Sequence, residues 1–190
     1  MEIARRAIER GIDKGGVQAA RLKIIEEAKK TKVMANGSRG FTSVGESLKR
    51  HWSSHDVDIN AGVSKAELDS FEDKHSVVLP EDLRDYFLCV NGMPHDVVDD
   101  GMIRFWMLEE LQPLPQGAPA FSDPSYIQNP ESLFLFADYS MWAHAYAIRL
   151  GSVPLQSNEV VIIGYKSPVT VSQYFSEFVD QYLTDKDRLH

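Results

Sequence analysis

Two histidines followed by two aspartates form the best candidate for a metal site in the sequence. His51 and His55 are four residues apart, so a helix would place both imidazoles on one face, where they could share an ion. Asp56 and Asp58 follow at once, and the group could serve a metal-dependent hydrolase. The two serines between the histidines predict that the helix frays there and leaves the rings exposed. We therefore expect no metal site, and the hydrolase remains the enzymatic alternative.

Neither the single cysteine nor the histidine of a predicted strand carries a catalytic pattern. Cys89 falls beside the apolar stripe of a predicted helix, where a packed thiol is expected, because a nucleophile would need an activating base. His144 alternates with aromatic and aliphatic residues, as a core histidine does. The sequence has no glycine-rich phosphate loop, nucleophile elbow or CxxC pair. We predict a non-enzymatic protein without catalytic residues or a cofactor.

Carboxylates are concentrated between residues 96 and 138. This stretch contains eight Asp or Glu residues and one basic residue, Arg104, so its net charge is −7. The first three lack the alternating oxygen ligands of a calcium loop. They form either a solvated turn or a charged loop that binds a partner. Five carboxylates, three in this loop and two in a short helix, are the candidate partner-binding residues: Asp96, Asp99, Asp100, Glu109 and Glu110.

Four aromatic residues lie near these acidic segments: Trp106, Tyr126, Tyr139 and Trp142. We expect most of their surface to be in the core. Any of them that reaches the surface beside the acidic loops would be a good anchor for a protein interface, because aromatic side chains dominate binding hot spots.

The segment 77–92 predicts a short strand at 77–79 followed by a helix. Pro80 suits the first helical position, and two acidic residues follow it in the first turn. The residues Leu83, Tyr86, Phe87 and Val90 recur on one helical face, and Asn91-Gly92 should end the helix. Upstream, Ser64 and Glu67 have the form of a capping box, and the apolar spacing at 44–52 predicts another helix.

Downstream of residue 92 the apolar pattern changes from helical spacing to alternation. Strands are predicted at 102–107, 132–138, 142–150, 159–165 and 169–171, before a last helix that carries Phe175, Phe178, Val179 and Tyr182 on one face. The small residues Ala143, Ala145 and Ala147 indicate a strand face that a helix covers closely. Helices, then strands, then a helix predict an α+β domain with a largely antiparallel, or mixed, sheet flanked by helices.

This composite of motifs resembles the SUKH superfamily, the Smi/Knr type of domain. The resemblance rests on the Ser64-capped helix that ends in Phe71-Glu72, on the LPxD-like entry into the next helix, and on its closing Asn91-Gly92. We predict that five residues of these motifs are a structural signature, because backbone geometry or core packing explains each of them without a ligand: Leu79, Pro80, Tyr86, Asn91 and Gly92. The resemblance has a functional implication as well. It implies a binding protein, either an immunity protein that blocks a cognate bacterial toxin, often a nuclease, or a regulatory interaction module.

Charge is divided unevenly along the chain, whose 190 residues are 43% hydrophobic and 25% charged, as in ordinary globular proteins. Residues 1–40 have ten Lys/Arg and five Asp/Glu, net +5, and predict a basic helical extension or arm, unless Met34 is the natural start. Residues 41–190 have ten and twenty-three, net −13, and predict the acidic domain. Such charge attracts a basic protein and disfavours nucleic acid. One cysteine and no long apolar segment favour the cytoplasm and no membrane contact.

Overall fold

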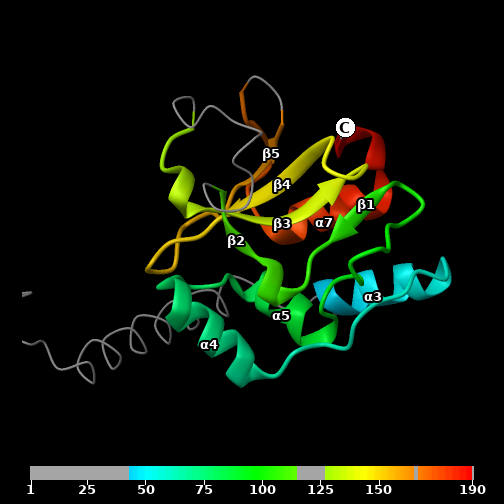
Figure 1. Ribbon diagram of the computed structural model, residues 1–190, viewed down its shortest axis with the longest axis horizontal. Coiled ribbons are helices and arrows are strands. Elements are labelled where there is room, and N and C mark those ends of the chain that lie inside the picture. Colours follow the sequence, from blue (N-terminus) through cyan, green and yellow to red (C-terminus); the bar gives the residue numbers. More distant parts are fainter. Residues whose placement is uncertain (1–42, 115–126, 165–166, 190) are drawn as a thin grey trace, which may run out of the picture. The chain divides into compact units, whose positions relative to one another are not determined.

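The structure is a computed structural model of the 190-residue chain, and it describes residues 43–114, 127–164 and 167–189. The predicted extension at 1–40 and the aromatic candidate Tyr126 lie outside the described residues. In chain order the elements are (Figure 1) α3 (Val44–Ser54), α4 (Lys65–His75), α5 (Glu81–Cys89), β1 (Ile103–Phe105), the 3-10 helix η1 (Leu108–Glu110), β2 (Gln112–Pro113), the 3-10 helix η3 (Pro130–Ser132), β3 (Leu133–Tyr139), β4 (His144–Arg149), β5 (Val160–Ile163), β6 (Val169–Ser172), α7 (Phe175–Thr184) and the 3-10 helix η4 (Lys186–Leu189).

Strand β3 is central to an antiparallel sheet with the order β1-β3-β4-β5-β6. Its other edge partner, β2, pairs with residues 134–135, while β1 pairs with residues 137–139. The tight connection from β3 to β4 pairs Tyr139 with His144. These pairings confirm the α+β prediction, and every strand pairing in the described chain is antiparallel.

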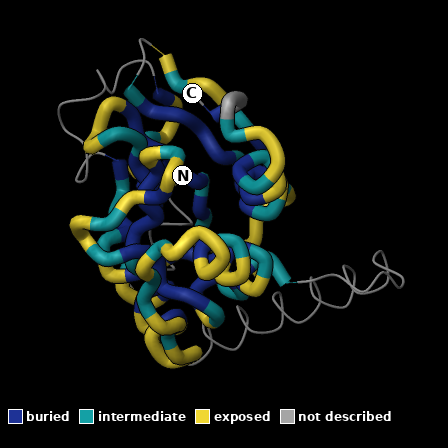
Figure 2. Tube along the Cα trace, turned by 90° about the vertical axis from the view of Figure 1, so that its right-hand side faces the viewer, coloured by how far each residue is buried: buried dark blue, intermediate teal, exposed yellow. Residues whose placement is uncertain are grey.

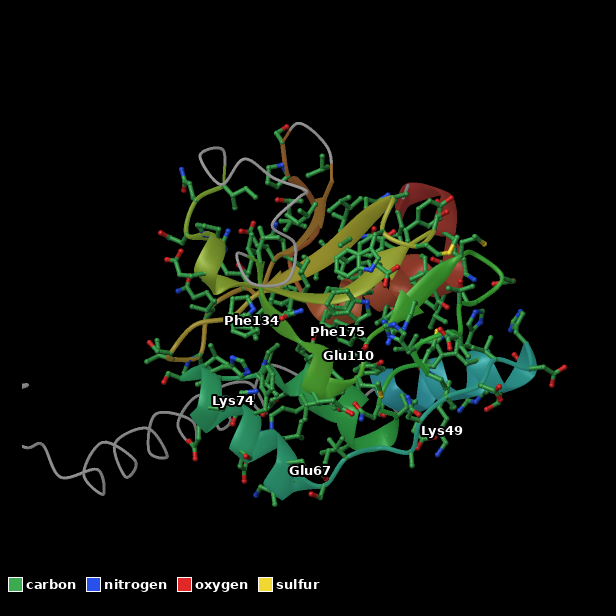
Figure 3. The ribbon with its side chains drawn as sticks, viewed as in Figure 1. Lys49, Glu67, Lys74, Glu110, Phe134 and Phe175 are labelled. Carbon is green, nitrogen blue, oxygen red and sulfur yellow. The ribbon has the colours of Figure 1, made fainter. Side chains whose placement is uncertain are left out.

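Helix α7 covers one face of this sheet with aromatic side chains. The ring of Phe178 lies 5.2 Å from that of Tyr146 and 5.3 Å from that of Phe136, both edge-on or tilted arrangements that aromatic pairs prefer. Phe134 of β3 and Phe175 of α7 are also buried in the interior (Figure 3). Figure 2 shows the sheet as largely buried and the outward sides of the helices as exposed.

The alanines of β4 lie on the other face of the sheet. Ala145 and Ala147 are buried and Ala143 is exposed, but the neighbour in α7 is Tyr146, which alternates with them. The prediction that a helix covers the alanine face is therefore wrong for α7. Helix α7 packs on the face of the sheet that carries Phe136 and Tyr146, because these rings fill the space between the sheet and the helix.

Helix α5 is bonded to α7 and to α3 through its acidic side chains. The backbone amide of Ser176, in the first turn of α7, donates to Asp82 Oδ2 at 2.8 Å. The amide of Gly45, in the first turn of α3, donates to Asp85 Oδ2 at 3.0 Å. Both carboxylates thus satisfy amides at the positive end of a helix, where negative charge is stabilising.

The connection from α4 to α5 is held by a buried carboxylate. Glu72 accepts a hydrogen bond from the Leu79 amide at 2.7 Å and forms an ion pair with Arg84 at 2.8 Å. Val78 makes one isolated bridge, to Gly151, and no strand forms at 77–79, so that strand prediction is wrong. The predicted capping box of α4 is confirmed, and Pro80 precedes the first residue of α5 as its N-cap rather than occupying the first helical position.

Asn91 and Gly92 follow α5 and position the next helix. Helix α5 ends at Cys89, two residues earlier than predicted, because Val90 is already extended. The Asn91 side chain accepts from the Leu108 amide at 2.7 Å and so fixes the start of η1. Gly92 has a φ of +64°, the left-handed conformation that its sequence position suggested.

The Tyr86 hydroxyl is buried and makes no hydrogen bond within the described chain. Burial raises the pKa of this hydroxyl well above its ordinary value; the nearby Gly92 backbone acts in the opposite direction, but it is not placed to form a hydrogen bond with the hydroxyl. The ring itself packs against Trp52 and Phe175. The signature tyrosine therefore contributes through its ring.

Replacing Tyr86 by phenylalanine should leave the free energy of unfolding unchanged or raise it by up to about 1 kcal/mol, because a buried unpaired hydroxyl is costly. Tyr86→Leu, which removes the ring, should lower it by about 1–3 kcal/mol. Urea unfolding of both variants measures the difference. A loss of more than about 1 kcal/mol in Tyr86→Phe would show that the hydroxyl forms a stabilising bond.

Candidate functional site

The acidic loop 94–102 is anchored by Asp99, whose carboxylate is buried. Asp99 Oδ1 accepts from the Ile103 amide at 2.7 Å, and Oδ2 accepts from the Tyr182 hydroxyl at 2.5 Å and from Lys186 Nζ at 2.9 Å. The Tyr182 hydroxyl in turn accepts from the Trp52 indole at 2.7 Å. Asp99 thus connects the loop to α7, to η4 and through Tyr182 to α3.

Lys186 bridges two neighbouring carboxylates that differ in burial. Its ammonium lies 2.9 Å from Asp99 and 2.5 Å from Asp100, whose side chains are 1% and 62% exposed. The hydrogen bond from Lys186 lowers the pKa of Asp100. Burial alone would lower the pKa of Lys186, but the carboxylates of Asp100 and Asp99 outweigh it and raise that pKa. Asp100 and Lys186 are therefore both charged at neutral pH.

Glu110 is paired in the same way at the other end of β1. Arg104, which is buried, contacts both Glu110 oxygens at 2.6 Å and donates through Nε to the Pro94 carbonyl at 3.2 Å. His95 lies 3.5 Å from the same carboxylate. Burial would raise the pKa of Glu110, but the hydrogen bond from Arg104 and other favourable contacts lower it. Through Arg104 the structure places loop 94–102 beside η1.

The five candidate carboxylates thus gather around β1 but have different surroundings. Asp96, Asp100 and Glu109 are exposed, Glu110 is partly buried, and Asp99 is enclosed. Asp100 pairs with Lys186 and Glu109 accepts from Asn91, but both stay exposed, whereas the partners of Asp99 and Glu110 within the domain largely keep these two carboxylates from solvent. The predicted role in partner binding accordingly falls on the three exposed carboxylates, for which it stays a prediction.

One of the aromatic candidates reaches the surface. Trp106 is buried and its indole donates to Asp138 Oδ2 at 2.6 Å, and Tyr139 is stacked on His144 with ring centroids 4.7 Å apart. Trp142 packs on Trp106, 5.0 Å between ring centroids, and is 36% exposed. Trp142 is thus the described aromatic that fits the predicted interface anchor.

Two exposed methionines that the sequence did not single out lie in the turn that contains Trp142 and in the turn that is hydrogen-bonded to it. Met102, in the acidic loop, is 41% exposed, and Met141, in the β3–β4 turn, is 80% exposed. A hydrogen bond of 2.8 Å from the Ser140 amide to the Met102 carbonyl joins their two turns. We refer to Met102, Met141 and Trp142 as the hairpin-end surface. Met141 and Trp142 lie in the turn between β3 and β4, and Met102 directly precedes β1.

The two histidines considered as a possible metal site, His51 and His55, contact each other. The two rings are 4.3 Å apart, and His55 Nδ1 lies 2.8 Å from the His51 carbonyl oxygen. The pKa of His51 is lowered by burial and by the neighbouring charges of His55 and Lys186. Across residues 43–114, 127–164 and 167–189, no three His, Cys, Asp or Glu side chains gather in a way that could hold a metal.

Cys89 and His144 have the packed environments expected of them. The thiol of Cys89 lies 3.8 Å from Ser43 Oγ and from Glu46 Oε1, and burial, with help from nearby carboxylates, raises its pKa. His144 is buried, and its Nε2 lies 3.0 Å from the Tyr146 hydroxyl. A raised pKa keeps the thiol protonated, which opposes nucleophilic chemistry.

The described helices include none with the length and apolar character needed to cross a bilayer. No curated protein matches the chain at a significant level. Residues 62–181, more than half of the chain, match the SMI1 / KNR4 family (SUKH-1). The match begins just before the Ser64 capping box, includes Asn91-Gly92 and every described strand, and extends into α7. The likeness to SUKH domains predicted from the sequence is confirmed, and this chain belongs to the SMI1 / KNR4 family (SUKH-1).

Proposed function

We propose that this chain is an immunity-type protein that binds a cognate basic toxin, such as a nuclease, and blocks it without itself catalysing a reaction. Membership of the SMI1 / KNR4 family supports the coarser role in protein interaction, since its members are often immunity proteins and are generally non-enzymatic. The toxin, its basic character and an action in the cytoplasm are our proposal.

The observation that carries the proposal is the scarcity of basic residues in the stretch of sequence that contains β1. Between Arg84 and Arg149 the sequence contains one Lys or Arg, Arg104, and that guanidinium is buried on Glu110. Lys186, from the C-terminal segment, forms ion pairs with Asp99 and Asp100. The exposed carboxylates of this region therefore face solvent without a competing cation from the same stretch.

Such a surface suits the binding of a cationic cleft. Nucleases bind phosphates with basic side chains, and the exposed carboxylates Asp96, Asp100 and Glu109 can occupy the same cationic groups. Like charge at the same time disfavours nucleic acid and anionic membranes as ligands. A domain charge of −13 for residues 41–190 would also steer a basic partner and accelerate association.

A neutralisation assay tests the proposal. The C-terminal domain of the protein encoded by the adjacent gene is expressed alone in a bacterial host, with and without this chain. We expect growth arrest without the chain and growth when it is co-expressed, with a complex recovered by size-exclusion chromatography. A toxic neighbour that the chain neither binds nor blocks, or a neighbour without toxicity, would reject the proposal.

Neutral substitution of two exposed carboxylates should weaken the electrostatic part of binding. Asp96→Asn with Glu109→Gln should slow association with the toxin that the chain blocks about three- to tenfold at low salt. The association rate should also depend less on salt. Glu81→Gln with Glu131→Gln removes the same charge from exposed positions on α5 and η3 and serves as the control. Equal association rates for both double variants across salt concentrations would place the contact surface elsewhere.

A further inference from the structure

The hairpin-end surface combines exposed apolar side chains with an unfavourable backbone. Seven non-glycine residues of the described chain have positive φ. Four of them are small and polar, as this conformation favours: Asp56, Ser76, Asn129 and Ser140. The other three are large and apolar, namely Met102, Met141 and Trp142, and together they make up the hairpin-end surface.

At Met141 the fold itself gains little from the choice of residue. Met141, with a φ of +52°, is 80% exposed, so its side chain contributes little to the core. Asparagine or glycine would adopt the same conformation with less strain and would be more soluble at a turn. Strained residues that persist without a structural benefit are characteristic of binding sites.

The surroundings of this surface restrict what can bind there. The two turns that form it, at 94–102 and 139–144, contain three aspartates and no lysine or arginine. Lys186, the cation that reaches them, is paired with Asp99 and Asp100. An apolar patch with a carboxylate rim is complementary to an apolar surface flanked by basic side chains.

We propose that the hairpin-end surface is the apolar anchor of the partner interface, and that the partner is a protein that presents an apolar pocket bordered by Lys or Arg. This inference rests on the proposed function and assigns its site. Met141 would enter the pocket, Trp142 would cover its edge, and Asp100 would meet the basic rim. A second copy of the chain fits poorly, because it would bring the same aspartates against each other.

A variant that relieves the strain and removes the apolar contact separates binding from folding. Met102→Asn with Met141→Asn keeps residues that tolerate positive φ and should raise the melting temperature by about 1–4 °C. Ser140→Asn, in the same turn and with the same left-handed conformation, is the matched control, because it changes no apolar surface. A purely structural role predicts no loss of binding in either variant.

The probe is a phage-displayed library of random 12-residue peptides, selected on the full chain in solution. We expect enriched peptides to combine apolar residues with Lys or Arg, to bind the Met102→Asn, Met141→Asn variant at least tenfold more weakly, and to bind Ser140→Asn as they bind the parent. An absence of enrichment, or equal binding to all three proteins, would overturn the inference.

Neutralisation of a toxin is measured separately, so the two proposals can fail independently. A chain that protects the host while its selected peptides bind the double asparagine variant unchanged retains the proposed function and loses this site. A chain that protects against no neighbouring toxin loses the proposed function, whatever the peptides show.

Discussion

Replacing Gly92 by valine should lower the free energy of unfolding by roughly 2–5 kcal/mol, a large part of the stability of a domain of this size. Gly92 has a φ of +64°, which a β-branched residue adopts only under strain. A Cβ atom at this position would also lie 2.5 Å from the Trp106 carbonyl oxygen and 2.7 Å from that of Phe105. Both are backbone atoms at the end of β1, so no side-chain rotation relieves the clash.

The matched control is Gly101→Ala, in the acidic loop. A Cβ there would approach side-chain atoms rather than backbone atoms, with Lys186 Cδ at 3.0 Å the nearest and Asp99 Oδ1 at 3.3 Å. We expect this variant to unfold within about 1 kcal/mol of the parent. Thermal and urea unfolding compare the three proteins. A Gly92→Val variant as stable as the parent would show that Gly92 is in the signature for a reason other than backbone geometry.

Much of the fold was predictable from the sequence because helix faces and strand alternation reflect burial. Strand β5 occupies the aliphatic run Val160–Ile163, and α3 buries Leu48 and Trp52 as their spacing indicates. The prediction of a strand at 77–79 was wrong because a side-chain carboxylate takes a backbone hydrogen bond that a strand would have used. The Leu79 amide donates to Glu72, seven residues earlier, instead of joining a sheet.

The candidate site was predictable only in part, because residue type does not give burial. Asp99 and Asp100 are adjacent and chemically identical, yet one is enclosed by Tyr182 and Lys186, which lie more than eighty residues away in the chain. Trp142 was a candidate anchor from its type and position. Nothing in the sequence indicates that Met141 adopts a left-handed conformation and projects beside it.

This difference between neighbouring aspartates also decides which substitutions can test partner binding. Neutralising Asp96, Asp99 and Asp100 together would not leave the fold intact. The Ile103 amide, the Tyr182 hydroxyl and Lys186 would all lose the Asp99 carboxylate on which they converge. A binding defect in that triple variant would therefore mix loss of structure with loss of surface charge, which is why Asp96 and Glu109 are the better pair.

Asp99→Ala should lower the free energy of unfolding by about 3–5 kcal/mol, since it removes the acceptor of the buried Tyr182 hydroxyl and of the Ile103 amide and one of the two carboxylates paired with Lys186. Asp100→Ala removes the other carboxylate of the same lysine, but from an exposed position, and should cost less than about 1 kcal/mol. Urea unfolding at neutral pH gives both values. Comparing the two variants controls for the loss of an ion pair with Lys186, because each variant leaves this lysine one of its two carboxylates.

A double-mutant cycle then tests whether Asp99 acts through the hydroxyl of Tyr182. Tyr182→Phe should be clearly less costly in the Asp99→Ala background than in the parent, with a coupling energy of about 1–3 kcal/mol, because the hydroxyl has already lost its acceptor. Tyr182→Phe with Asp100→Ala should be additive. Equal costs for Asp99→Ala and Asp100→Ala, together with additive behaviour in both cycles, would mean that the buried carboxylate does not anchor loop 94–102. The loop would then owe its position to its backbone hydrogen bonds and to the packing of β1 against β3.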